Sequence, residues 1–149
     1  MRDGFREDAE SESAFAIEVG GEPAGVDAES VGLGGEPVGV DGELAGWLGF
    51  EEETDPGYVH AGIDISLDPR FRGQGLGPDA VRTAIRWLAR ERGHHRFTID
   101  PSAQNERAIR AYESVGFKPV GLLRRYERDA GGSGFHDGLL MDLLIEELR

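Results

Sequence analysis

Residues 70–77 read RFRGQGLG and are followed at once by Pro78. Glycine occupies every second position from 73 to 77, so no side chain separates this backbone from whatever lies beside it. The residues before it alternate like a strand, and those after it recur at helical spacing. Because the unpaired N–H groups and the positive dipole end of a helix point at the loop before it, this order predicts an anion-binding loop.

Spacing excludes two common nucleotide-binding motifs. A Walker loop ends in Gly-Lys-Ser/Thr, whereas Gly77 is followed here by Pro78 and Asp79. A dinucleotide fingerprint reads GxGxxG, whereas Gly73, Gly75 and Gly77 give GxGxG. A tight turn without a ligand remains the structural alternative.

The segments around this loop predict regular structure. Alternating apolar positions indicate strands at 14–19, 44–50 and 58–67, the last with Asp64 on the face opposite its isoleucines. The helix predicted over 78–93 starts near Pro78 and stops at Gly93. Its inner face is Val81, Ala84, Ile85 and Leu88, and its outer stripe is Arg82, Arg86 and Arg90.

The rest of the chain predicts a strand at 95–100, a second helix capped by Asn105 and closed by Gly116, and strands near 117–126 and 138–145. The whole is a mixed α/β domain with helices covering a sheet. A repeat, GGEPAGV at 20–26 and GGEPVGV at 34–40, is interpreted as a local duplication that lengthens a hairpin or loop.

Length and composition favour one domain over residues 14–149, behind a disordered acidic segment, 1–13. The absence of cysteine, of a signal core and of a membrane-length apolar run predicts a soluble cytoplasmic protein. Residues 1–60 hold 16 acidic residues against 2 arginines, whereas 61–149 hold 13 against 14 basic residues. We therefore expect no nucleic-acid or membrane partner, and an affinity for cations.

The sequence resembles the GNAT superfamily of N-acetyltransferases. RGQGLG, set between a strand containing GID and a helix, is similar to the family's acetyl-CoA pyrophosphate loop. TIDPSAQNERAIRAYESVGF is similar to its later strand and helix, and together with EEETDPG, GIDISL and HDGLLMD it resembles aminoglycoside 6'-N-acetyltransferases over residues 44–146. The resemblance implies a GNAT-like acyl-CoA N-acyltransferase sheet flanked by helices, here lacking the family's N-terminal strand and two helices.

The resemblance also implies a cosubstrate, acetyl-CoA, and the residues that hold it. Backbone N–H groups near 65–67 would polarise the thioester, and Arg72 or Arg110 would contact phosphate. The predicted cofactor-binding residues are Ile65, Ser66, Leu67, Arg72, Gly73, Gln74, Gly75, Leu76, Gly77 and Asn105. Asn105 has a simpler alternative role as a helix cap.

Acetyl transfer to an amine needs a group that removes a proton, because an amine with a pKa of about 10 is mostly protonated at neutral pH. Asp55, Asp64 and Asp100 fall where the family presents carboxylates to the acceptor, with Asp64 or Asp100 as the base. Tyr112 matches the family's general acid. The structural alternatives are a turn residue for Asp55 and a core aromatic for Tyr112.

The predicted acceptor is a small polycation, an aminoglycoside 6'-amine, for which Glu51, Glu52 and Glu53 would add attraction. The alternatives are a siderophore hydroxylysine, a protein amine, or an inactive CoA-binding module. With the N-terminal helices missing, the acceptor site is either open or completed by a partner subunit in a homodimer. No metal site is expected, because solvated or turn positions explain the four histidines, His60, His94, His95 and His136.

Overall fold

A computed structural model describes residues 13–19 and 43–149. The expected disorder before residue 13 and the repeated glycine-rich stretch lie outside this part. So does the expected lack of a strand and two helices at the N-terminus. None of the described helices is long and apolar enough to cross a membrane.

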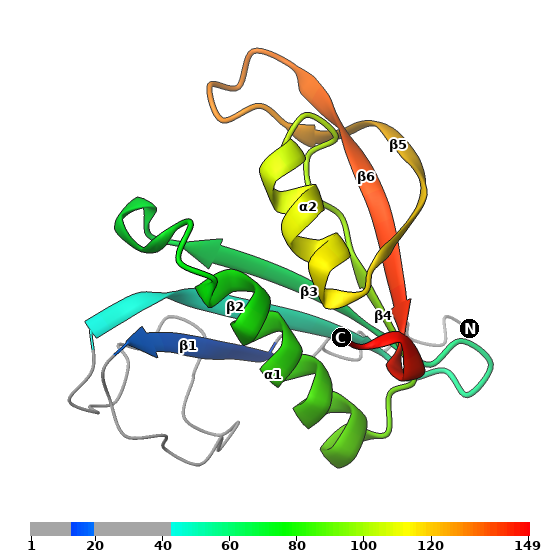
Figure 1. Cartoon of the computed structure of the whole chain (residues 1–149). Coiled ribbons are helices and arrows are strands. Elements are labelled where there is room, and N and C mark those ends of the chain that lie inside the picture. The colour runs from blue at the N-terminus through cyan, green and yellow to red at the C-terminus, as the bar shows by residue number, and fades with distance from the viewer. Residues whose placement is uncertain (1–12, 20–42) are drawn as a thin grey trace, which may run out of the picture.

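The described residues form a six-stranded sheet in the order β1-β2-β3-β4-β6-β5 (Figure 1). Only the β3–β4 pair is parallel, and the other four pairs are antiparallel. The strands are β1 (Ser13–Val19), β2 (Glu43–Glu53), β3 (His60–Leu67), β4 (Arg96–Ile99), β5 (Lys118–Arg128) and β6 (Phe135–Leu144). The fold is therefore mixed α/β, as the sequence predicts.

Two helices cover one face of this sheet, α1 (Leu76–Arg92) between β3 and β4 and α2 (Glu106–Val115) between β4 and β5 (Figure 1). The apolar face predicted for α1 is confirmed, since Val81, Ala84, Ile85 and Leu88 are all buried. They share one core with inward residues of the sheet such as Phe97 and with Val115 of α2. Both helices end as predicted at a left-handed glycine, Gly93 and Gly116.

The sheet opens between its two central strands. β2 and β3 pair along eight positions, from Gly46 with Leu67 to Glu53 with His60. The parallel ladder of β3 with β4 joins only Ala61 to Phe97 and Gly62 to Thr98. Beyond Gly62 the two strands diverge, so β1-β2-β3 and β4-β6-β5 form two arms of one sheet (Figure 1).

Several element bounds differ from the prediction. β2 continues through the charged residues 51–53, and the turn that follows is closed by the Tyr58 N–H bond to the Asp55 carbonyl, 2.8 Å. α1 begins at Leu76, inside the glycine stretch, and β6 already begins at Phe135. Alternating extended backbone carries a strand through these charged and polar residues once a neighbouring strand is present.

Arg82 is not part of a solvated stripe. Its side chain is only 23% exposed, and its Nε donates to the Arg149 carbonyl at 2.7 Å. A second nitrogen, Nη2, donates to the Ser114 carbonyl at 3.4 Å. Because α2 and the last residues pack against this flank of α1, Arg82 ties the C-terminal residue and α2 to α1.

His94 lies between α1 and β4 and is buried, so of the two predicted positions, solvated or turn, the solvated one is wrong for it. It is 4% exposed, and its Nε2 lies 2.6 Å from Oε1 of Glu52. The charged run 51–53 therefore does not point one way as a group. Strand alternation turns Glu52 into the protein, toward His94.

Candidate active site

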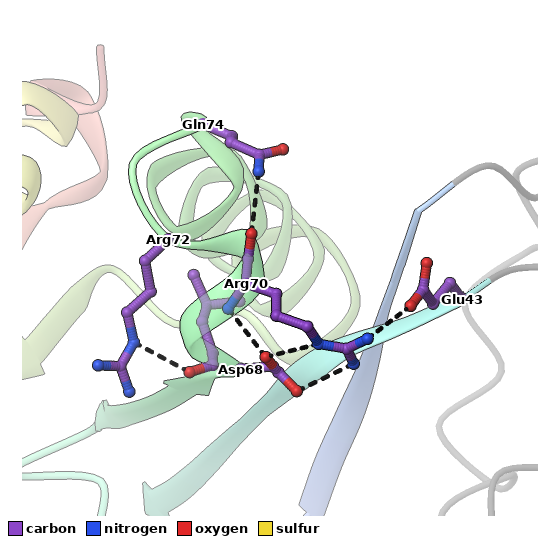
Figure 2. Close-up of polar contacts among 6 residues, drawn as sticks. Glu43, Asp68, Arg70, Arg72 and Gln74 are labelled. Carbon is purple, nitrogen blue, oxygen red and sulfur yellow. Dashed lines mark hydrogen bonds and ion pairs between the residues drawn. The ribbon is translucent and has the colours of Figure 1, made fainter.

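Hydrogen bonds and ion pairs fix the chain just after β3. Asp68 caps the short helix η2 (Pro69–Phe71), accepting a hydrogen bond from the Arg70 backbone N–H at 2.9 Å. The Arg70 guanidinium donates back to both Asp68 oxygens and also to Glu43 on β2, at 3.1 Å each (Figure 2). Arg70 thereby links the start of the loop to the neighbouring strand.

Two of the predicted cofactor-binding side chains fold back onto this segment. Arg72 Nε donates to the Leu67 carbonyl at 3.1 Å, and Gln74 Nε2 donates to the Arg70 carbonyl at 3.1 Å (Figure 2). Both bonds shape the backbone of the glycine loop, which we define as residues 72–77. Arg72 and Gln74 thus have a structural role in the loop, whatever else they contact.

Glycine is required within the loop by its backbone angles. Gly73 has φ of +77° and Gly75 has φ of +82°, in the left-handed region that side chains disfavour. A Cβ added at Gly75 would meet no atom within 4 Å, so this side of the loop is bare. The first turn of α1 leaves the N–H groups of Leu76 and Gly77 without a helical partner, as anion binding requires.

A second cation reaches the loop from α2. An atom at the Cβ position of Gly73 would lie 2.5 Å from Nη2 of Arg107, so this guanidinium covers Gly73. The sequence interpretation missed Arg107 and named Arg110 instead, which forms an ion pair with Glu106 at 3.3 Å on the same helix. The available signal was the helical position of Arg107, two residues after the cap.

Asn105 caps α2, as predicted, by accepting a hydrogen bond from the Ala108 N–H at 3.1 Å. The cap uses its side-chain oxygen. Its amide nitrogen, a donor, is the part of Asn105 that could serve a ligand.

Asp64 and Asp100 lie near enough to Tyr112 for their charges to act on it, although the three residues come from different parts of the chain. Asp64 lies on β3, Asp100 directly follows β4, and Tyr112 lies on α2. Burial raises the pKa of Tyr112 to about 12, with help from the charges of Asp64 and Asp100. We call these three residues the Tyr112 cluster.

The electrostatics of Asp64 also reflect this proximity. Partial loss of water raises the pKa of its carboxyl group, and the carboxylates of Asp100 and Glu127 raise it further. A hydrogen bond from the Ile65 N–H acts in the opposite direction. Asp64 is therefore more basic than an ordinary aspartate, which suits a group that accepts a proton.

The backbone of 65–67, predicted to polarise a thioester, lies on the part of β3 beyond its pairing with β4. Its groups are partly engaged, because the Leu67 carbonyl accepts a hydrogen bond from Arg72. The carbonyl of Ser66 lies against Gly46 of β2 so closely that no Cβ would fit there.

Asp55 is placed apart from the cluster. It lies in the turn between β2 and β3, where its Oδ1 accepts the Gly57 N–H at 2.8 Å. Among the residues that the structure describes, no hydrogen bond or ion pair connects it to the Tyr112 cluster. Of the two roles considered for Asp55, in the turn or in acceptor binding, the structure shows the role in the turn.

Tyr126 of β5 is a residue that the sequence interpretation missed. Its hydroxyl donates to Oδ2 of Asp100 at 2.7 Å. This hydrogen bond raises the pKa of Tyr126 to about 12, and the charges of Asp100, Glu51 and Glu127 contribute. Nothing in a strand-like run of residues signals that one tyrosine will reach an aspartate 26 positions away.

His136 bridges the β5–β6 hairpin. Its Nδ1 lies 3.0 Å from Asp129 and its Nε2 lies 3.2 Å from Glu127. The hydrogen bond to Asp129, followed by that to Glu127, raises the pKa of His136 above its ordinary value of 6.5. A group whose pKa is raised by folding stabilises the fold while it is protonated.

We expect the contribution of His136 to hairpin stability to be complete below pH 6.5 and to be lost as the pH rises through the higher pKa of the folded state. A ring NMR titration should give a midpoint above 6.5. The variant His136→Gln should lack this pH dependence in urea unfolding. A midpoint at or below 6.5 would contradict the two ion pairs.

Within residues 13–19 and 43–149, no three or more His, Asp or Glu side chains gather as they would around a metal ion. The expected absence of a metal stays a prediction.

The chain is similar to known proteins in a consistent way. The model of the acetyltransferase (GNAT) family matches residues 2–117. A kanamycin resistance protein of Rhizobium radiobacter is 44% identical over 75 residues, which are 50% of this chain and 68% of that protein. An aminoglycoside N(6')-acetyltransferase type 1 of Klebsiella pneumoniae is 42% identical over 79 residues, 52% of this chain and 37% of that protein.

Solved structures agree with the fold. The ribosomal-protein-S18-alanine N-acetyltransferase of Escherichia coli superposes with a TM-score of 0.59 and is 29% identical. The superposition covers 72% of this chain and 65% of that one. The matched part thus spans between about a third and two thirds of these relatives.

Proposed function

Because the chain belongs to the acetyltransferase (GNAT) family, we propose that it transfers the acetyl group of acetyl-CoA to a primary amine of a small polycation, an aminoglycoside 6'-amine. The observation that carries this proposal is the Tyr112 cluster, which joins two carboxylates and a phenol where β3 and β4 diverge. The kanamycin resistance protein and the 6'-acetyltransferase are similar to this chain over about half of its length and support the choice of acceptor.

The cosubstrate would be held by its phosphates. The N–H groups at the start of α1 and the bare backbone at Gly75 suit the diphosphate, with Arg107 and the amide of Asn105 as further donors. We also propose that residues 14–149 form one N-acetyltransferase domain. The molecular mass of the protein in solution tests whether this domain forms a homodimer.

The chemistry follows from the cluster. A carboxylate takes a proton from the ammonium group of the acceptor, and the freed amine attacks the thioester carbonyl. The C–N bond forms and the C–S bond breaks, and the nitrogen loses a second proton as it becomes an amide, which replaces the proton that Tyr112 gives up. Tyr112, whose phenol stays protonated because its pKa is about 12, gives a proton to the leaving sulfur. The carboxylate that has taken up the first proton is neutral. It therefore disfavours the negative charge that forms on Tyr112 less than an ionised carboxylate would.

The charges of the site favour a polycation. Asp64, Asp100, Glu51 and Glu127 lie near enough to the two tyrosines for their charges to raise a tyrosine pKa. Several carboxylates around one site raise the local concentration of a cationic acceptor and hold it for reaction.

An acceptor panel tests the function. Acetyl-CoA is mixed separately with kanamycin, spermidine, and a peptide that begins with alanine, and thiol release and product mass are measured. We expect kanamycin to react fastest, at its 6'-amine. Fastest reaction of the peptide would favour a protein amine, the acceptor class of the E. coli neighbour. Acetyl-CoA that raises the melting temperature while no amine reacts would indicate an inactive CoA-binding module.

A further inference from the structure

The hairpin that carries Tyr126 is irregular at one point. β5 and β6 pair Leu123 with Gly138 and then Glu127 with His136, so residues 124–126 of β5 face the single residue Asp137 of β6. Such a bulge re-aims a side chain that a regular strand would direct elsewhere. Here the re-aimed side chain is Tyr126, whose hydroxyl reaches Asp100.

The bulge is held in a costly conformation. Arg125 has φ of +50°, the only positive φ of a non-glycine residue in the part of the chain that the structure describes. Residues in this region cost about 1–3 kcal/mol and persist only where the surroundings fix them. Asp137 supplies that fixation, since its Oδ1 accepts the Arg125 N–H at 2.7 Å.

The position of the Tyr126 ring is fixed from the other strand. A Cβ added at Gly138 would lie 2.9 Å from Cδ1 of Tyr126, so the ring rests on the bare glycine backbone. Strain at Arg125, a carboxylate that holds it and a glycine that accommodates the ring all serve one contact, the 2.7 Å bond to Asp100. A surface tyrosine with no task would need none of these.

This bond makes the two aspartates of the Tyr112 cluster unequal. Oδ2 of Asp100 is occupied by the Tyr126 hydroxyl. The carboxylate of Asp64 has no such side-chain hydrogen bond among the described residues, and its surroundings raise its pKa. A carboxylate fixed by a phenol suits an anchor for a cation, and the other is left to exchange a proton.

We propose that Tyr126 is a positioning residue that holds Asp100 as the anchor of the cationic acceptor and thereby leaves Asp64 as the base. The proposal rests on the proposed acetyl transfer. One proton of the acceptor ammonium goes to Asp64, the C–N bond forms as the C–S bond breaks, and Tyr112 protonates the sulfur. The second proton that the nitrogen loses as it becomes an amide reprotonates Tyr112, and Asp64 later releases its proton to solvent.

The charged and titratable groups near Asp64 and Tyr126 come from four elements, β2, β3, α2 and β5, and from the residue after β4. They are Glu51 of β2, Asp64 itself on β3, Asp100, Tyr112 of α2, and Tyr126 and Glu127 of β5. Two of these, Asp100 and Glu127, act on Asp64 directly by charge, so the pH profile must be compared between variants that keep Glu127.

The first test compares Tyr126→Phe with Tyr58→Phe, a matched change at a tyrosine that is 75% exposed in the β2–β3 turn. Tyr126→Phe should raise KM for the acceptor about three- to tenfold, the range of one partly exposed hydrogen bond to a charge, with kcat changed less. Tyr58→Phe should match the wild type. Indistinguishable kinetics of the two variants would overturn the proposal.

The pH profile of kcat separates the aspartates. Asp64→Asn should lose the acidic limb of the profile, whereas Asp100→Asn should keep the limb and raise KM. Tyr126→Phe combined with Asp100→Asn should be no worse than Asp100→Asn alone, because both changes remove one bond. The reverse assignment of limb and KM would overturn the proposal.

A measurement that does not depend on activity distinguishes failure of this proposal from failure of the proposed function. The Cζ signal of Tyr126 should titrate at about 12 in the wild type and move toward 10 in Asp100→Asn. Titration near 10 in the wild type would show that the bond is absent and overturn the proposal, even if acetyl transfer is measured. Titration at about 12 in a protein that acetylates no amine would overturn the proposed function and, with it, the base assigned to Asp64.

Discussion

Replacing Tyr112 with phenylalanine is expected to lower kcat about 100- to 10,000-fold, the range typical of a lost general acid. The phenol is protonated throughout the neutral range, because its pKa is about 12, and the charges of both carboxylates act on it. Phenylalanine keeps the ring but has no proton to give to the leaving thiolate. Steady-state rates with saturating acetyl-CoA and acceptor measure the effect.

The same variant should change the affinity for acetyl-CoA and the melting temperature only slightly. The ring of Tyr112 packs edge-on against Phe117, with centroids 6.2 Å apart, and phenylalanine retains this contact. A core role for Tyr112 therefore predicts little change in rate. If kcat stayed within a few-fold of the wild type, Tyr112 would be a packing residue and the acid would have to be sought elsewhere.

Gly75→Ala is expected to weaken acetyl-CoA binding by about tenfold or more, because a methyl group would stand between the diphosphate and the loop backbone. The position faces open space, with no protein atom within 4 Å of the added Cβ. The left-handed φ of +82° adds a folding cost of about 1–2 kcal/mol. Calorimetry with acetyl-CoA measures the first effect and urea unfolding the second.

Gly93→Ala is a matched control at the other end of the same helix. Gly93 has φ of +75°, and a Cβ there also meets nothing within 4 Å. Both variants should therefore lose about the same stability, and only Gly75→Ala should lose affinity. Equal affinities in the two variants would mean that the loop does not bind the diphosphate and is a tight turn.

Local pattern predicts the elements of this fold well. The four buried residues of α1 recur at helical spacing, so the sequence alone identifies the face that packs on the sheet. The cap of α2 and both glycine stops depend on a few consecutive residues and are likewise visible in the sequence. These features are predictable because the interactions that produce them are short in range.

Side chains that contact distant segments were harder to predict. Arg82 matches the spacing of a solvated stripe, and only the packing of α2 and of the last residue turns it inward. His94 follows a helix stop, and its buried partner, Glu52, lies 42 positions earlier. Neither contact leaves a local trace in the sequence.

For the same reason, only some residues of the candidate site could be predicted. Tyr112, Asp64 and Asp100 could be named because a resemblance preserves motifs over long separations. Arg107 and Tyr126 could not, because their roles depend on the register of β5 with β6 and on how close α2 comes to the glycine loop.

The short parallel ladder between β3 and β4 has a consequence for stability. With two paired positions in that ladder, much of what unites the two arms comes from the shared core beneath α1 and α2. A thioester carrier that touched the loop before α1 and also Arg107 on α2 would bridge both arms. The bound carrier would then hold the two arms together. The protein should unfold more cooperatively and at a higher temperature as the carrier concentration rises above its dissociation constant.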